Sequence, residues 1–358
     1  MFAKSLRAAF TLSLLLLSAS LSSAVLAQEK TTAQTPPSVG TPVVWRDPGD
    51  ISARDLRYGA GSAELAPAAP FTFVKEDKLG ASPKFEVKDS KGTTWVVKLG
   101  VEAQSETVAT RLAWAMGYFA EEAYYFDRAE IGGLPRLARG QEFVENNRIV
   151  RGVRFEPRRE QAARGATWDW LKNPFVGSRE LDGLKVLMVL LANYDTRLDN
   201  NHVITVVNPE SGQPEARYVV TDIGATLGHV GGLGGKRSKN NLEDFRSSKF
   251  ILGVTDGMVE FDYNTTPSGG GKFASFFNPG YRKTQANKEK AMRRIPVESA
   301  RWIGSQLARL SDEQLRDAFN AAGYDQPTRE GFVKVLRERI QQLNQLSAAP
   351  QTATVVGK

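Results

Sequence analysis

The sequence predicts an α+β fold in which an antiparallel sheet comes first and a mainly helical part follows. The first half contains short segments of alternating polarity separated by turn residues, a pattern typical of strands and hairpins. The second half contains apolar residues at helical spacing behind residues that cap helices. With 358 residues, 41% of them hydrophobic, the chain is long enough for one large or two small domains with a sizeable core.

The predicted sheet begins with a strand at residues 71–75 and a hairpin after it. Residues 84–89 (KFEVKD) alternate in polarity, residues 94–99 (TWVVKL) form an apolar run, and the Asp-Ser-Lys-Gly between them has the composition of a turn. A helix is expected over residues 102–116, and Gly117 stands where a C-terminal cap belongs. A second hairpin is expected in this part, with strands at 141–144 and 148–155 and a turn at Asn146-Asn147.

The helical part begins with residues 181–192 (LDGLKVLMVLLA), which are apolar on nearly every side and therefore predict a buried helix. Strands are expected at 203–207 and 217–222, joined by the turn-rich segment NPESGQP. Residues 229–279 are glycine-rich and are expected to be irregular. Helices are expected after Pro296, one behind a capping box at Ser311–Gln314 and the last one capped by Thr328.

The N-terminus predicts a cleavable secretory signal over residues 1–27. Lys4 and Arg7 supply positive charge, an apolar segment follows, and Val25 and Ala27 are small residues before a cut at Gln28. The alternative is an uncleaved anchor, but the apolar segment is short for a membrane span of about 20 residues. We expect export to a periplasmic or extracellular location and no membrane span after cleavage. Polar segments at 28–41 and 347–358 are expected to be a flexible linker and a disordered tail.

Composition excludes several kinds of chemistry. The chain has no cysteine and two histidines, which excludes disulfides, thiolate sites and multi-histidine zinc centres. The formal net charge of +7 fits attraction to phosphate-bearing ligands or to an anionic envelope surface. No dense Lys/Arg run with interleaved aromatic residues occurs, so a nucleic-acid partner is not expected. Catalysis, if present, depends on carboxylates, amides, hydroxyls, lysine and arginine.

The strongest chemical signal combines Asp195 and Asn200 in one loop with Asp222 at the end of a hairpin. Phosphoryl transfer needs a carboxylate for the attacking hydroxyl, and an amide oxygen and a second carboxylate for Mg²⁺. The loop follows a buried helix, and the return strand brings Asp222 back beside it. Asp195 is therefore the candidate catalytic residue, and Asn200 and Asp222 are the candidate metal ligands. The alternative is that these residues only form turns.

The second signal lies upstream, where the segment Gly80-Ala-Ser82-Pro-Lys84 precedes the hairpin. Glycine at such a connection lets backbone N–H groups approach phosphates. Lys98 near the end of the next strand and Glu106 in the following helix match a lysine that binds phosphates and a glutamate that steers it. The alternative is an ordinary hairpin whose lysine reaches solvent. Lys98 stands within an apolar run, which disfavours that alternative.

These residues carry a family resemblance. The segments GASPKFEVKDSKGTTWVVKLG, ETVATRLAWAMGY, NYDTRLDNNHVI and VVTDIGATL resemble HipA-like kinases, over about residues 71–227. The resemblance implies a protein-kinase-like two-lobed fold with an N-lobe at 42–160 and a C-lobe at 161–346, and binding of ATP with Mg²⁺. It implies that Gly80, Ser82, Lys84 and Lys98 bind the nucleotide, that Lys98 and Glu106 form an ion pair, and that Asp195, Asn200 and Asp222 have the roles given above. The family's loop histidine is Arg197 here, and the layout is shared with phosphatidylinositol-kinase-like and CotH-like kinases.

The sequence thus leads to two hypotheses of different class. The first is an exported phosphotransferase that uses Mg-ATP, with protein Ser/Thr hydroxyls as the default acceptor and a small molecule as another. Nucleotidyl transfer stays open beside phosphorylation. The second is a catalytically silent binding module of the cell envelope that keeps the fold, because ATP is scarce outside the cytoplasm. A third reading is a basic envelope protein whose motifs are coincidental. The joint presence of both motifs favours an enzyme.

Overall fold

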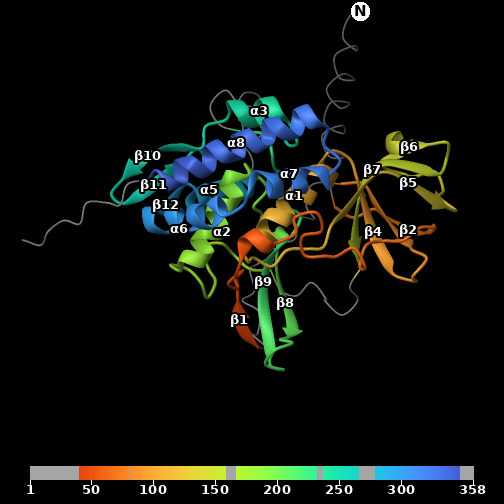
Figure 1. Ribbon diagram of the computed structural model, residues 1–358, viewed down its shortest axis with the longest axis horizontal. Helices are drawn as coiled ribbons and strands as arrows, with labels where there is room; N and C mark the ends of the chain where they lie inside the picture. Colours follow the sequence, from red (N-terminus) through yellow and green to blue (C-terminus); the bar gives the residue numbers. More distant parts are fainter. Residues whose placement is uncertain (1–39, 81, 159–166, 232–236, 266–278, 347–358) are drawn as a thin grey trace, which may run out of the picture. The chain divides into compact units, whose positions relative to one another are not determined.

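The structure, a computed structural model, describes residues 40–80, 82–158, 167–231, 237–265 and 279–346. All described residues belong to one compact unit, 35–358. Strands and helices are both abundant, so the predicted α+β class is confirmed (Figure 1). The expected signal peptide, most of the linker and the tail lie outside the described residues, as does the predicted lobe boundary at 160/161.

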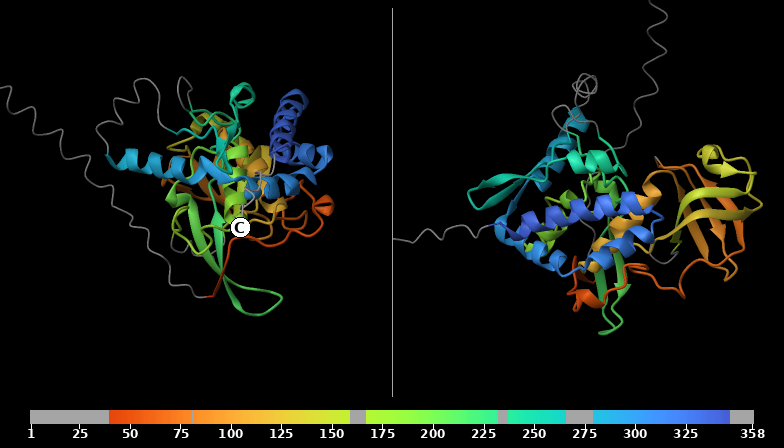
Figure 2. Two further views of the ribbon diagram at one scale, coloured as in Figure 1. Left: turned by 90° about the vertical axis from the view of Figure 1, so that its left-hand side faces the viewer. Right: turned by 45° about the horizontal axis from the view of Figure 1, so that its top comes forward.

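The largest sheet has the strand order β4-β3-β2-β5-β7-β6, and a further pairing of β4 with β7 joins five strands into a ring. The pairs are antiparallel except for a short parallel contact between β2 and β5 at Phe71 and Thr72. Figure 2 shows these orange and yellow strands as one group. Their bounds are β2 Phe71–Asp77, β3 Lys84–Lys88, β4 Thr94–Leu99, β5 Tyr124–Gly132, β6 Val144–Glu145 and β7 Ile149–Pro157.

The strands follow from alternation, because every second side chain of a strand points to the same face. Phe85, Val97 and Phe155 are buried in one apolar cluster on that face. Both predicted turns are present: the amide of Gly92 donates to the Asp89 carbonyl at 3.0 Å, and both Asn146 and Asn147 have positive φ. The second hairpin differs in one detail, since residues 141–143 form a 3₁₀ turn (Gln141–Phe143) and its first strand is only β6.

Helix α1 (Glu102–Ala115) matches its prediction within one residue. Gly117 follows it with a φ of 86°, and a Cβ there would lie 2.1 Å from the Arg46 carbonyl oxygen. The position therefore requires glycine, as expected for a helix end. The helix packs against β7, and α1 also contacts α7 (Asp312–Asn320).

A second sheet positions the candidate loop. Its order is β1-β9-β8, with β1 Thr41–Val43 parallel to β9 Pro214–Val220, and β8 Asn201–Val207 antiparallel to β9. Helix α2 (Arg179–Leu190), whose first turn is capped by Ser178, precedes the β8–β9 hairpin and is buried along nearly its whole length. The predicted buried helix and hairpin are thus both present, and the loop between them is held at both ends.

Three predictions in the later part of the chain are corrected. Residues 229–279 are not irregular throughout, because they contain a short helix and two strands. Helical structure begins before Pro296. Thr328 does not cap the last helix: Asp325 is the N-cap and accepts from the Thr328 amide at 2.9 Å, because the helix begins two residues earlier with Pro327 in its first turn. The capping box at Ser311–Gln314 is confirmed. The elements are α3 Leu242–Ser247, β10 Ile251–Thr255, β11 Met258–Phe261, α5 Pro279–Met292, β12 Arg294–Pro296, α6 Val297–Ala308, α7 Asp312–Asn320 and α8 Gln326–Asn344.

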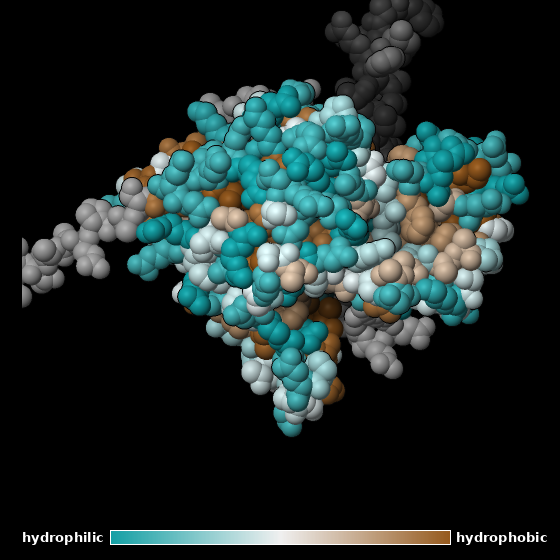
Figure 3. All heavy atoms as spheres, in the orientation of Figure 1, coloured by the Kyte–Doolittle hydropathy of each residue, from teal (hydrophilic) through white to brown (hydrophobic). Residues whose placement is uncertain are grey.

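Buried apolar residues form two clusters. The smaller is enclosed by the large sheet, and the larger joins α1 and α2 with the later helices. The face drawn in Figure 3 is mostly hydrophilic. Among the described residues, none of the helices has the length and apolar character needed to span a bilayer.

Candidate active site

The loop at residues 191–200 is fixed by backbone hydrogen bonds at both of its ends. The amide of Leu227 donates to the Leu191 carbonyl at 2.8 Å, and the amide of Thr221 donates to the Asn200 carbonyl at 2.7 Å. The β8–β9 register continues this pairing, since Asn201 lies opposite Val220. Asn200 therefore lies beside the residue that precedes Asp222. The hairpin brings the two candidate metal ligands together, as the sequence predicted.

Lys98 of β4 joins the upstream motif to this loop. Its Nζ lies 3.2 and 3.3 Å from the two carboxylate oxygens of Glu106 and 2.6 Å from Oδ1 of Asp222. Glu106 on α1 is fully buried, and the Lys98 side chain is 10% exposed. Three residues separated by up to 124 positions thus meet at one ammonium group. The predicted Lys98–Glu106 pair is present in this geometry.

Arg154 of β7 is a fourth member that the sequence did not single out. It lies opposite Lys98 in the β4–β7 register, is fully buried, and its Nη2 is 3.1 Å from Glu106 Oε2 and 2.9 Å from Glu156 Oε2. One signal in the sequence could have identified Arg154: it is a charged residue within the predicted strand 148–155, next to apolar residues. We call Lys98, Glu106, Arg154 and Asp222 the strand cluster.

Charge and burial compete within the strand cluster. Burial alone raises the pKa of Asp222, but the charge of Lys98 and its hydrogen bond, with Arg154 and Arg197 farther away, lower that pKa to about 2. Burial lowers the pKa of Lys98, yet the carboxylates of Glu106, Asp222 and Glu156 together outweigh it and raise that pKa above its ordinary value. Asp222 is therefore ionised across the physiological range. An ionised carboxylate such as that of Asp222 can bind a metal ion, and a charged ammonium group such as that of Lys98 can bind phosphate oxygens.

Asp195 belongs to a second group of charges. Its amide donates to Asn193 Oδ1 at 2.9 Å, and its carbonyl accepts from Asn200 Nδ2 at 2.7 Å. Arg197 binds both of its carboxylate oxygens, with Nε 2.7 Å from Oδ1 and Nη2 2.8 Å from Oδ2. Lys288 of α5 lies 3.5 Å from Oδ1. We call Asp195, Arg197 and Lys288 the loop cluster.

Among the described residues of the predicted phosphate loop, the side chains of Ser82 and Lys84 pair with residues outside these clusters. Gly80 has a φ of 74°, as a tight connection needs, and its carbonyl accepts from Arg139 at 2.7 Å. Ser82 Oγ donates to Glu102 at 2.7 Å, at the start of α1. Lys84 lies beside Lys98 in the β3–β4 register but is 3.3 Å from Asp77 instead. The predicted residues of the 191–200 loop, Asp222 and Lys98 are thus linked by contacts, whereas the side chains of Ser82 and Lys84 are paired elsewhere.

The donor chemistry at Asn200 and Asp222 fits a magnesium ion. Both offer oxygen, and within the described residues nothing donates to Asn200 Oδ1, because the contacts of this side chain are made through Nδ2. No group of three or more His, Asp or Glu side chains able to hold a metal occurs in the described part of the chain. Mg²⁺ is commonly held by one or two carboxylates, with water and phosphate oxygens as its other ligands.

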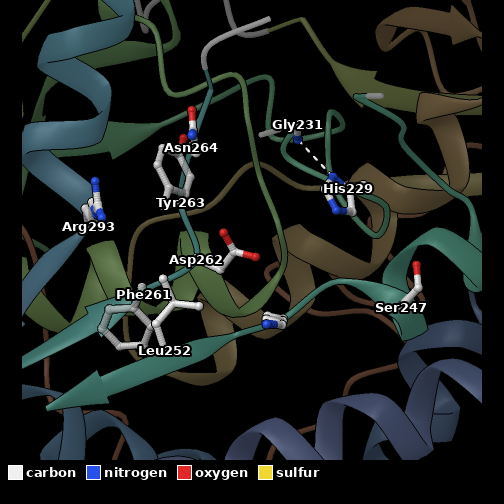
Figure 4. A pocket seen from close by; sticks show the side chains of 10 residues that line it. His229, Gly231, Ser247, Leu252, Phe261, Asp262, Tyr263, Asn264 and Arg293 are labelled. Atoms are coloured by element: carbon white, nitrogen blue, oxygen red, sulfur yellow. Dashed lines mark hydrogen bonds between the residues drawn. The ribbon is translucent and has the colours of Figure 1, made fainter. Parts of the chain in front are cut away.

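A pocket of about 400 Å³ is lined by none of the predicted site residues (Figure 4). Its wall includes Tyr263, whose buried hydroxyl donates to the Asn193 carbonyl at 2.8 Å and lies 2.9 Å from Thr196 Oγ1. The pocket wall thus supports the loop that carries Asp195. The lining residues are His229, Gly231, Ser247, Lys249, Leu252, Phe261, Asp262, Tyr263, Asn264 and Arg293.

Comparison with known proteins adds little to this geometry. No protein-family model matches the chain, and no curated protein matches it. Among solved structures, it is similar to the crystal structure of a Helicobacter pylori proinflammatory kinase, CtkA. The identity is 12%, the match covers 78% of this chain and 97% of that one, and the TM-score is 0.41. At that TM-score the likeness carries no argument, so function has to be inferred from the site.

Proposed function

We propose that the chain is an exported phosphotransferase with a two-lobed, HipA-like kinase fold. It would use Mg-ATP and transfer phosphate to hydroxyl groups, with protein Ser/Thr as the default acceptor. One observation supports this most: an unbroken series of contacts leads from Asp195 through Asn200 and Thr221 to Asp222, and from there to Lys98 and Glu106. These are the residue types that phosphoryl transfer needs, and they belong to four different elements.

The proposed roles follow from the position of each side chain. Mg-ATP, when bound, supplies the phosphoryl group and neutralises its charge. Asn200 and Asp222 hold the metal through their oxygens. Lys98, oriented by Glu106, holds phosphate oxygens, and the segment with Gly80, Ser82 and Lys84 covers them.

Asp195 acts at the acceptor. Its carboxylate orients the acceptor hydroxyl and takes its proton while the acceptor oxygen forms a bond to the γ-phosphorus. The bond from that phosphorus to the bridging oxygen breaks, and ADP leaves with the electron pair. A general base of this kind typically increases the reaction rate by about 10²–10⁴-fold. Arg197 binds the same carboxylate and is 46% exposed, so it is free to move away when the acceptor arrives.

A second candidate function is the silent binding module, and the Arg197 contact favours it. Both oxygens of Asp195 are already bound by one guanidinium group. A protein that keeps this pair closed would recognise ligands without transferring phosphate.

The two candidates differ in what Asp195→Ala removes. In an enzyme, Asp195→Ala abolishes most phosphate transfer and leaves Mg-ATP binding nearly intact, whereas Asp222→Asn lowers both because a charged metal ligand becomes neutral. The measurement is calorimetric titration paired with radiolabel transfer on parent and variants, first as autophosphorylation and then with envelope extract. Undiminished transfer by folded Asp195→Ala overturns the catalytic assignment. No transfer by the parent with any metal favours the binding module.

Export is proposed on the same footing, from Lys4, Arg7 and the apolar run that follows. Cleavage after Ala27 gives a chain that begins at Gln28, which mass spectrometry of envelope material detects. An intact Met1 on a membrane-embedded product contradicts cleavage.

A further inference from the structure

Lys288 is a buried lysine that no motif accounts for. It lies on α5, far along the chain from the candidate loop, and is 5% exposed. Its Nζ donates to the Tyr194 carbonyl at 3.1 Å and lies 3.5 Å from Asp195 Oδ1. Lysine is rarely buried unless its charge is paired. Here the nearest carboxylate is at the limit of hydrogen bonding.

The ammonium group of Lys288 has unused capacity. It carries three donors, and in the described part of the chain its contacts are Tyr194 and Asp195. The charged groups around it are Asp195, Arg197 and Arg237, so two of the three are cations. Burial accordingly lowers the pKa of Lys288 to about 8, which the charge of Asp195 only partly offsets. Among the described residues, Asp195 is the one carboxylate in contact with Lys288, and it lies 3.5 Å away.

Lys288 contrasts with Lys98 in this respect. Lys98 contacts two carboxylates within 3.3 Å, so its charge is balanced inside the protein. Lys288 contacts the carboxylate that would receive the acceptor hydroxyl. An ammonium group beside that carboxylate is close to the place where the acceptor oxygen would meet the γ-phosphorus. The negative charge that develops during transfer is spread over the three oxygens of the γ-phosphate.

We propose that Lys288 is a further catalytic residue, which binds a γ-phosphate oxygen of ATP with the donor that Asp195 and Tyr194 leave unused. The inference rests on the proposed function and deepens it, because it assigns to α5 a cation that distinguishes ATP from ADP. The same contact keeps Asp195 and the transferred group within reach of one another. Preorganised cations of this kind stabilise the charge of the transition state.

A purely structural role for Lys288 makes a different prediction. If the lysine only holds the loop through Tyr194, its loss disturbs ATP and ADP binding alike. If it binds the γ-phosphate, its loss weakens ATP binding alone, because ADP lacks that group.

The test is calorimetric titration of the mature protein with Mg²⁺ and a non-hydrolysable ATP analogue, and separately with Mg-ADP. Lys288→Met removes the charge at similar length, Lys288→Gln keeps a donor for the Tyr194 carbonyl, and Lys288→Arg keeps the charge. Lys290→Met is the matched control, because Lys290 is an exposed lysine on the same helix. We expect Lys288→Met and Lys288→Gln to weaken binding of the analogue about 10- to 100-fold, the range of one hydrogen bond to a charged group. Mg-ADP binding should stay unchanged in both variants, and Lys288→Arg should regain part of the loss.

The outcomes separate this inference from the proposed function. Failure of the parent to bind either nucleotide overturns both. In a second outcome, the parent binds nucleotide while the variants lose affinity for the analogue and for ADP equally, or lose none. Either result overturns the assignment of Lys288 and leaves the proposed function standing. Should Lys288→Met be unfolded by thermal melting, Lys288→Gln decides the result.

Discussion

The strand cluster joins two carboxylates to two basic side chains and the loop cluster joins one carboxylate to two, and the clusters differ in how closely those charges are paired. Glu106 is fully buried, and Lys98 and Arg154 approach it from two neighbouring strands within 3.2 Å. Asp195 is 22% exposed, its arginine is 46% exposed, and its lysine lies 3.5 Å away. The carboxylate of Glu106 is paired on both sides without a ligand, although Nε and Nη1 of Arg154 have no hydrogen-bond partner among the described residues. The charges of the loop cluster are paired less closely and are more exposed.

The difference separates Glu106 and Arg154, which are buried within the framework, from the side chains to which we assign contacts with ligands, those of Lys98 and Asp222 included. Regular elements with hydrogen-bonded registers hold the strand cluster, so Glu106 has little freedom to leave Lys98. A short loop and one helix hold the loop cluster, and Arg197 has to move for an acceptor to reach Asp195. Framework charges should therefore be costly to remove, whereas reaction charges should affect ligands more than folding.

The largest effect on folding is expected from Arg154→Met. Removing one partner of a buried pair leaves Glu106 and Glu156 with less compensation and costs about 3–5 kcal/mol. Arg197→Met is the matched variant in the loop cluster, where a partly exposed pair contributes about 0–1 kcal/mol. Urea unfolding of both variants and the parent measures the difference. Equal losses would remove the distinction between the two clusters.

A smaller effect is expected from pH. The pKa of Lys288 is about 8 in the folded chain and 10.5 is its ordinary value, so between these values the unfolded chain binds more protons. The free energy of unfolding contributed by Lys288 therefore rises as pH increases from about 8 to 10.5. In Lys288→Met this rise is lost, while Lys290→Met retains it. Denaturant unfolding at several pH values checks the sign, and a parent whose slope matches Lys288→Met contradicts a lowered pKa.

Local patterns were sufficient to predict most elements around the site. The hairpin of β3 and β4, helix α1 and the capping box at Ser311–Gln314 each depend on neighbouring residues, and the structure contains them. Thr328 was wrongly chosen as a cap, because Asp325 three residues earlier makes the same kind of hydrogen bond and Pro327 suits the first turn. Strand β5 and helix α5 went unnoticed, since their sequences mix charged and apolar residues without a clear period.

Spacing was sufficient to predict that Asp195 and Asn200 share one loop and that a hairpin returns Asp222 beside it, and their chemical roles stay a prediction. Lys98 and Glu106 followed from order along the chain. Lys288 could not be found in this way, since the sequence around it, KTQANKEKAM, is that of an exposed helix. Its burial arises from packing of α5 beside a loop about 90 residues earlier, and no local pattern records such a contact.

The ring of five strands has a consequence for self-association. Its closure depends on two residues, Phe71 and Thr72, so the rest of β2 is paired on one side only. An open strand edge invites pairing with another chain. This edge carries Lys75, Glu76 and Asp77, whose charges oppose such pairing. A neighbouring segment also covers part of it, since Glu76 accepts from the amides of Ala138 and Arg139, and Arg139 donates to the Asp77 carbonyl. The polar end of β2 thus protects the sheet from strand addition, and replacing these charges with β-branched apolar residues should promote aggregation.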